Sequence, residues 1–117
     1  MADAVTDTIN TGGRLIVEAG TGVGKSMAYL LPAAIYAASN NRRVIISTNT
    51  LNLQDQLVTK DLPMVLTGMA KVPELSDLDV TFTQLKGRSN YLCYNRLQAL
   101  RNSPSVDEPQ SRLLAKI

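Results

Sequence analysis

The segment AGTGVGKS, Ala19 to Ser26, constrains this chain more than any other because it gathers three glycines, a lysine and a hydroxyl in one turn. It follows the apolar run Leu15 to Val17, which is typical of a buried strand. A long stretch rich in alanine and leucine follows it and predicts a helix. A strand, a glycine loop and a helix in this order are the context of a phosphate-binding loop.

Each residue type in this loop suits a phosphate group. The glycines allow turns closed to other residues, so that backbone N–H groups face inward, and the start of the helix adds positive charge. Lys25 is expected on the β- and γ-phosphates of ATP, and the Ser26 hydroxyl on Mg²⁺, which makes these two the candidate catalytic residues. The alternative is a chance glycine turn before a core helix. The predicted nucleotide-binding residues are Ala19, Gly20, Thr21, Gly22, Val23, Gly24, Lys25 and Ser26.

Hydrophobic patterning predicts an α/β fold with a parallel sheet. Because strands and helices alternate, right-handed crossover connections are expected. A mixture of loop and weak helix is expected over 64–79, a linker over 102–111, and a kink in the predicted helix 25–39 at Pro32. The expected strands cover 15–17, 43–47 and 80–83, and the expected helices cover 2–10, 25–39, 51–60, 91–100 and a stretch from 112 onward.

Two further segments carry candidate functional residues. Thr48, Asn49 and Thr50 follow the second predicted strand, where they either cap a helix or bind phosphates of a nucleic acid. In the segment KGRSNYLC, Lys86 and Arg88 are either a solvated face or phosphate contacts, and Cys93 taken alone is a buried small hydrophobic residue.

Composition limits the possible functions. The chain has 117 residues, a net charge of +2, one cysteine and no histidine. An internal disulfide, a self-contained zinc site and histidine-based catalysis are therefore excluded. The small charge gives no argument for nucleic acid from bulk electrostatics. With no signal-peptide pattern and no long apolar run, we expect a cytoplasmic protein that does not enter a membrane.

Three segments, EAGTGVGKSMAYLLPA, VIISTNTLNLQDQL and LKGRSNYLC, together resemble the first motifs of the DinG/XPD-like iron–sulfur DNA helicases of superfamily two, in particular the DinG/YoaA branch. The resemblance covers Met1 to about Leu97. It implies a P-loop NTPase with a partial RecA-like motor domain, which uses ATP and Mg²⁺ to unwind DNA in the 5′ to 3′ direction, with a role in DNA repair.

The resemblance also implies roles for individual residues. Cys93 would be the first of four thiolates that hold a [4Fe–4S] cluster. Thr48 to Thr50 would contact single-stranded DNA, and Lys86 and Arg88 would neutralise its phosphates. The chain departs from the family pattern in lacking three of the four cysteines, the acidic motif that orients Mg²⁺, the adenine-reading segment and the second motor domain. We therefore expect a fragment that cannot hold the cluster by itself.

The predicted domains are 1–85, the N-terminal part of the ATP-binding domain, and 86–117, the start of the iron–sulfur domain. A small phosphoryl-transfer kinase and a non-catalytic nucleotide-binding remnant are the alternatives. Because the predicted strands 15–17 and 43–46 would lack neighbours in a RecA-like sheet, we also expect the 117 residues to self-associate.

Overall fold

The computed structural model describes residues 1–103, 109 and 112. The chain divides into two compact units, 1–84 and 85–117, and each is described by itself. The linker predicted over 102–111 and the helix predicted from 112 onward lie almost entirely outside the described residues. Where the structure describes the chain, no helix combines the length and the apolar character needed to cross a membrane.

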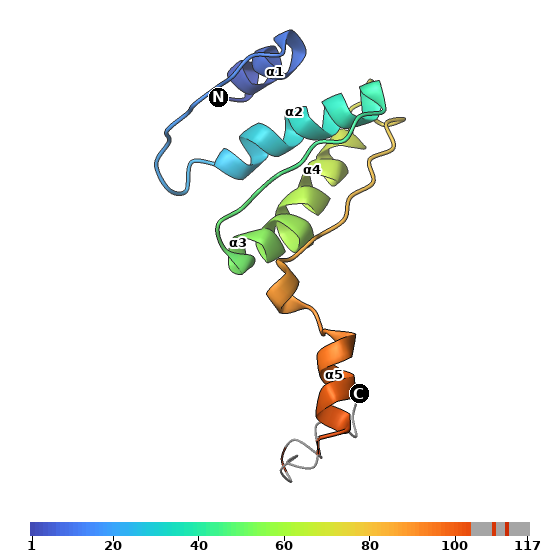
Figure 1. Ribbon diagram of the computed structural model, residues 1–117. Helices are drawn as coiled ribbons and strands as arrows, with labels where there is room; N and C mark the ends of the chain where they lie inside the picture. Colours follow the sequence, from blue (N-terminus) through green and yellow to red (C-terminus); the bar gives the residue numbers. More distant parts are fainter. Residues whose placement is uncertain (104–108, 110–111, 113–117) are drawn as a thin grey trace. The chain divides into compact units, whose positions relative to one another are not determined.

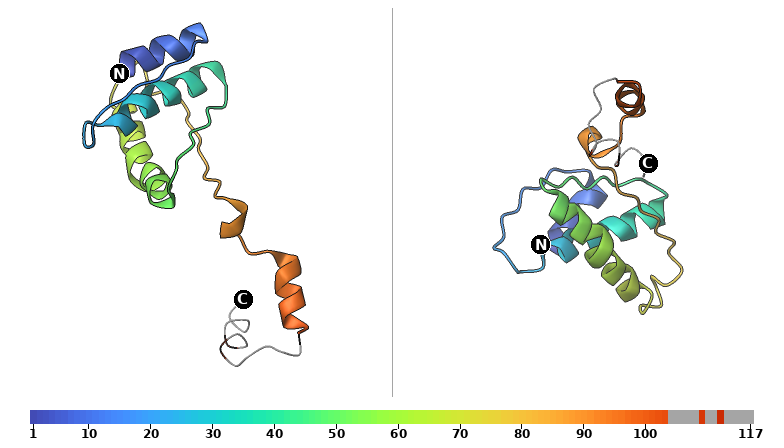
Figure 2. Two further views of the ribbon diagram at one scale, coloured as in Figure 1. Left: turned by 60° about the vertical axis from the view of Figure 1, so that its left-hand side comes forward. Right: turned by 90° about the horizontal axis from the view of Figure 1, so that it is seen from below.

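The first unit begins with two helices that lie side by side. Helix α1 (Ala2–Thr11) ends at Gly12, whose φ of 76° is in the left-handed region that glycine readily adopts. Helix α2 (Lys25–Asn40) contacts α1 and lies beside it in Figures 1 and 2. Both helices agree with the bounds expected from the sequence to within a residue or two.

Helix α2 is the central element of this unit. It continues through Pro32, which is buried together with Leu30, Ala33 and Ala34. It ends at Asn41, which has a φ of 48° and donates its backbone N–H to two carbonyls of the last turn. Asparagine tolerates this left-handed conformation better than most residues, which explains why the helix stops here.

The second helical stretch is longer than expected. It starts with α3 (Leu51–Gln56), passes through a π-helical turn, η1 (Leu57–Asp61), and continues as α4 (Leu62–Met69). The helix expected over 51–60 is therefore too short, and the mixture of loop and weak helix expected from there to Asp79 begins with the regular helix α4 and continues as turns. Pro63 lies in the first turn of α4, directly after the π-helical turn, where the regular hydrogen-bond pattern of the α-helix is already interrupted, so its missing backbone N–H costs less than in a regular helix interior.

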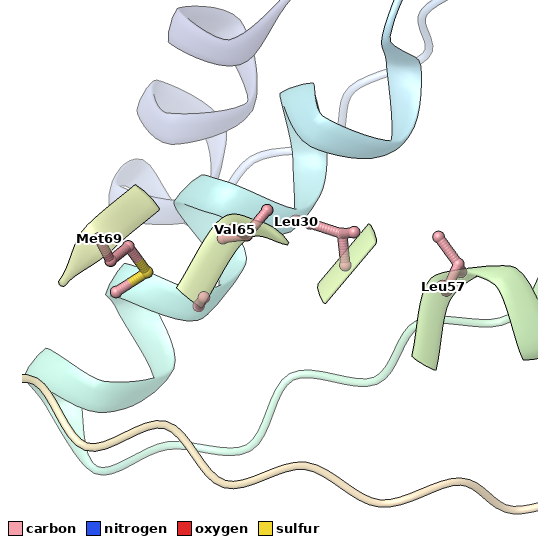
Figure 3. Close-up of a cluster of buried hydrophobic side chains, with 5 residues drawn as sticks. Leu30, Leu57, Val65 and Met69 are labelled. Atoms are coloured by element: carbon pink, nitrogen blue, oxygen red, sulfur yellow. The ribbon is translucent and has the colours of Figure 1, made fainter. Parts of the chain in front are cut away.

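The core of the first unit lies where α2 meets η1 and α4. Its buried side chains come from all three elements: Leu30 and Ala34 from α2, Leu57 from η1, and Val65 and Met69 from α4 (Figure 3). Partly buried residues such as Leu62 and Val80 pack around this cluster. The packing of helix on helix thus stabilises this unit.

The predicted parallel sheet is wrong for the part of the chain that the structure describes. Every regular element there is helical, and the segments 15–17, 43–47 and 80–83 run outside any strand ladder. No backbone hydrogen bond joins 14–18 to 43–47.

The exposed side chains give the physical reason for this correction. Ile16 is 99% exposed and Ile45 is 91% exposed. The prediction assumed that both faces of each apolar run would be buried. An apolar run favours a strand only where neighbouring strands and covering side chains complete its surroundings.

Asp61 is a buried carboxylate, only 5% exposed, in the π-helical turn. The side-chain amide of Gln56 donates a hydrogen bond to its Oδ2 at 3.0 Å. Because a carboxylate is costly to bury without donors, this bond stabilises the buried position of Asp61 and links the end of α3 to η1.

We expect Gln56→Ala to lower the free energy of unfolding by about 1 kcal/mol, because Asp61 then loses a donor in a buried position. Urea unfolding followed by circular dichroism measures this change. Asn52→Ala, on the exposed surface of α3, is the matched control and should change stability by less than about 0.5 kcal/mol. Equal effects of the two substitutions would contradict the role given to the Gln56–Asp61 bond.

The second unit contains a short 3₁₀ turn, η2 (Arg88–Asn90), and helix α5 (Tyr94–Arg101). The helix expected over 91–100 therefore starts three residues later than predicted. Leu97 is the buried side chain of α5, at 8% exposure.

Candidate nucleotide-binding site

The glycine loop connects the irregular segment 13–20 to the first turn of α2. Gly22 and Gly24 have φ values of 78° and 77°, so a side chain at either position would strain the backbone. Gly20 differs from the prediction, because its φ is not positive and an added Cβ would meet no atom within 4 Å. The conformational need for glycine is thus confined to Gly22 and Gly24.

Gly24 is also the N-cap residue of α2, and no side chain caps this end of the helix. The backbone N–H groups of the first helical turn therefore remain available to an anionic ligand, and the helix dipole adds partial positive charge there. A phosphate group matches both properties.

Lys25, the first residue of α2, points back over the loop. Its Nζ donates hydrogen bonds to the backbone oxygens of Ala19 and Gly20, both at 2.5 Å. An ammonium has three hydrogens, so two hold the side chain on the start of the loop and one is left for a phosphate oxygen. The sequence did not predict that these two carbonyls anchor the lysine.

Ser26 follows Lys25 in the first turn of α2 and is partly buried. Its hydroxyl makes no hydrogen bond to another described residue. A hydroxyl at this place can contribute one oxygen to Mg²⁺, which is a metal that takes oxygen ligands. The loop therefore brings together Lys25, Ser26 and the backbone of residues 19–24.

The second candidate loop, Thr48 to Thr50, precedes α3. Thr50 caps this helix by accepting a hydrogen bond from the backbone N–H of Leu53 at 3.2 Å. The hydroxyl of Thr48 donates to the backbone oxygen of Thr50 at 3.2 Å. Helix capping, the simpler of the two interpretations, thus explains the position of Thr50. Asn49 makes no part of the cap and is exposed in the loop.

The remaining candidates belong to the second unit. The phenol oxygen of Tyr91 accepts a hydrogen bond from the backbone N–H of Lys86 at 2.9 Å, and the backbone N–H of Asn90 donates to Gly87 at 2.8 Å. These bonds close a compact turn that carries Arg88 on its exposed surface. Sequence reasoning missed Tyr91, which lies five residues after Lys86 and directly after the 3₁₀ turn.

Cys93 lies immediately before α5 and is exposed, which contradicts the interpretation of a buried small hydrophobic residue. An exposed thiol is open to oxidation and to metal ligation. Where the structure describes side chains, no group of three or more cysteine, histidine or acidic residues could hold a metal ion. One thiolate does not suffice for an iron–sulfur cluster, so Cys93 could only share such a site with ligands from outside these residues.

Comparison with known proteins decides the family. Residues 2–88, most of the chain, match the DEAD/DEAH box helicase family. The chain belongs to this family. Among solved structures, none matches the chain.

Curated relatives place this DEAD/DEAH box helicase chain near the DinG and YoaA proteins, which confirms the resemblance seen in the sequence. It is 44% identical to the ATP-dependent helicase DinG of Mycobacterium tuberculosis strain H37Rv over 116 residues, 97% of this chain and 17% of the relative. It is 47% identical to the ATP-dependent DNA helicase YoaA of Escherichia coli K12, over 84% of this chain and 14% of that protein. The 3′-5′ exonuclease DinG of Bacillus subtilis 168 is 39% identical over 84% of the chain and 10% of its own length. The chain thus spans less than a fifth of each of these relatives.

Proposed function

We propose that this chain supplies the ATP-phosphate-binding loop of an ATP-dependent DNA helicase. The single observation that carries the proposal is the position of Lys25, which loop carbonyls hold at the start of α2 beside glycines in left-handed conformations. Membership of the helicase family and the names of the DinG and YoaA relatives support it over a small kinase.

In this proposal the residues have separate tasks. Backbone N–H groups of 20–24 surround the phosphates, and Lys25 neutralises charge on the β- and γ-phosphates. Ser26 supplies an oxygen to Mg²⁺, which on binding would offset the negative charge of the phosphate oxygens. Single-stranded DNA is contacted by four residues: Thr48, Asn49, Lys86 and Arg88. The motor moves along this DNA in the 5′ to 3′ direction, in the cytoplasm, during DNA repair.

Binding and turnover of ATP test the proposed site. The 117-residue chain should bind Mg²⁺–ATP weakly and release no phosphate above buffer. Hydrolysis depends on further groups that stabilise the charge on the γ-phosphate, and the sequence shows no acidic motif for this task. A phosphate-release assay with excess ATP measures turnover. Phosphate release that the substitution Lys25→Ala abolishes would show that the chain hydrolyses ATP, and the expected inactivity would be wrong. If the chain binds no ATP at all, the proposed site is wrong.

We further propose that Cys93 is one of four thiolate ligands of a [4Fe–4S] cluster in a longer protein that contains this chain. The exposed thiol at the start of α5 supports this assignment. The 117 residues alone should purify colourless, since one thiolate does not retain a cluster.

In the longer protein, Cys93→Ser should remove the iron and its visible absorption, whereas Ser103→Ala in the same unit should leave both unchanged. Iron content by metal analysis and an absorption spectrum measure the effect. If the Cys93→Ser protein keeps its full iron content, the ligand assignment fails.

A further inference from the structure

A side-chain hydrogen bond in the first unit joins two segments that are distant in the sequence. The side-chain amide of Gln84 donates to Oδ1 of Asp55 at 2.7 Å, across 29 positions of the chain. Asp55 belongs to α3, whereas Gln84 is the last residue of the first unit. In Figure 1 the segment 80–84, which follows the turns after α4, runs back toward α3. The bond therefore fastens the end of this unit to α3.

The segment 80–84 is held at its two ends. Val80 packs against the buried cluster, whereas residues 81–83 are exposed. Gln84 is partly buried again, as is Asp55. The segment lies outside any strand ladder. Because carboxylate oxygens are strong acceptors, the bond to Asp55 anchors Gln84 in place of a strand neighbour.

Helix α3 connects this anchor to the loop that precedes it. Thr50 caps α3 through the backbone N–H of Leu53, and the hydroxyl of Thr48 donates to the backbone oxygen of Thr50. Asp55 follows Thr50 by about a turn and a half of helix. The loop, the helix and Gln84 thus belong to one hydrogen-bonded structure.

The anchor also restricts the chain that follows it. Lys86 comes two residues after Gln84, and two residues of chain span at most about 7 Å. The backbone N–H of Lys86 donates to the phenol oxygen of Tyr91, so the turn that carries Lys86 starts directly after the anchor. Loss of the bond to Asp55 would free the residues before Lys86 to move.

We propose that Asp55 and Gln84 are positioning residues for single-stranded DNA, a role that rests on the proposed function. Their hydrogen bond holds the chain that leads to Lys86 on the helix that follows Thr48 and Asn49, so that both segments bind phosphates of the same strand. Neither Asp55 nor Gln84 contacts the DNA. Without their bond, the DNA must order the two segments as it binds, and the lost conformational entropy lowers the affinity.

The affinity for a fluorescently labelled oligothymidylate, measured by anisotropy, tests this role. Gln84→Ala should weaken binding about fivefold, the usual cost of ordering a free side chain or loop. It should also make the dependence of log K on log salt concentration shallower by about 0.7, which corresponds to one phosphate contact on a single strand. Thr83→Ala, at the exposed neighbouring position, should change neither quantity.

The affinity for Mg²⁺–ATP separates positioning from a general loss of structure. Gln84→Ala should bind Mg²⁺–ATP as tightly as the wild-type chain does, since the glycine loop is distant from residue 84 in the sequence. If Gln84→Ala weakens ATP and DNA binding equally, the bond has only a structural role and the proposal is wrong.

An exchange of the two groups tests the bond itself. Gln84→Glu places two carboxylates opposite each other and should weaken DNA binding at least about tenfold. Gln84→Glu/Asp55→Asn again places a donor opposite an acceptor, at the net charge of the wild-type chain, and should bind DNA within about twofold of it. Gln84→Glu/Asp79→Asn has the same net charge, with the exposed Asp79 neutralised instead, and should stay weak. Equal recovery in the two double variants would overturn the proposal.

Two further outcomes separate this inference from the proposed function. If the wild-type chain binds no oligothymidylate, the proposed DNA contacts are wrong, and the positioning role falls with them. If Lys86→Ala weakens DNA binding but Gln84→Ala does not, the DNA contacts stand and the positioning role alone is wrong.

Discussion

Replacement of Leu30 by alanine is expected to lower the free energy of unfolding by about 2–5 kcal/mol, the usual cost of removing a buried leucine side chain. Leu30 is 2% exposed and lies at the centre of the cluster that joins α2 to η1 and α4. A typical domain is stable by only about 5–15 kcal/mol, and this helical core is small. The Leu30→Ala chain should therefore lose most of its cooperative transition.

The neighbouring Leu31 provides a matched control. It is in the same helix and has the same chemistry, but it is 38% exposed. Leu31→Ala should cost less than about 1 kcal/mol, because less apolar surface leaves the core. Urea unfolding of both variants by circular dichroism gives the comparison. A larger loss for Leu31→Ala than for Leu30→Ala would show that α2 packs through a different face.

The second large effect is expected at the phosphate loop. Lys25→Ala should weaken the binding of Mg²⁺–ATP by about ten- to a hundredfold, which corresponds to the roughly 1.5–3 kcal/mol of a charged hydrogen bond. The alanine also removes the link from α2 to the carbonyls of Ala19 and Gly20. Titration with a fluorescent ATP analogue measures the dissociation constant.

Lys60→Ala is the control for this substitution, since Lys60 is exposed and lies in the π-helical turn, away from the glycine loop in sequence. It removes the same charge and should leave ATP affinity within about twofold, because exposed charges are screened by water and salt. If both lysine variants bind equally weakly, net charge rather than the loop explains the binding.

The sequence predicted the bounds of a helix well where the residues at its two ends favour a non-helical conformation. The bounds of α2 follow from Gly24 and Asn41, both of which adopt left-handed conformations. Helix α4 was expected only as weak helix although it contains Pro63 in its first turn, because proline breaks a helix interior but is tolerated at a helix start. The sequence alone does not tell whether a proline will lie in the interior of a helix or in its first turn.

The predicted sheet failed for a different reason. The runs at 15–17 and 43–47 have the composition of strands, but a strand also needs a hydrogen-bonded neighbour. That neighbour depends on contacts distant in the sequence. The apolar character of Ile16 and Ile45 therefore predicted burial, whereas the structure leaves both exposed.

The candidate site was predicted in its residue types but not in its contacts. The glycines, Lys25 and Ser26 form a local pattern that can be recognised without a structure. Which carbonyls hold the lysine, and which phenol holds the Lys86 turn, depends on backbone conformation. Three local motifs together indicated the helicase family, and the match of residues 2–88 confirmed it.

The central claim is that the loop 19–26 binds the phosphates of ATP. The most direct measurement is a titration of the ¹⁵N-labelled chain with Mg²⁺–ATP, followed by amide chemical shifts. The largest saturable shifts should occur at Gly22, Gly24, Lys25 and Ser26; inorganic triphosphate should reproduce them, and adenosine should not. Shifts of equal size with adenosine, or shifts centred outside residues 19–26, would contradict it.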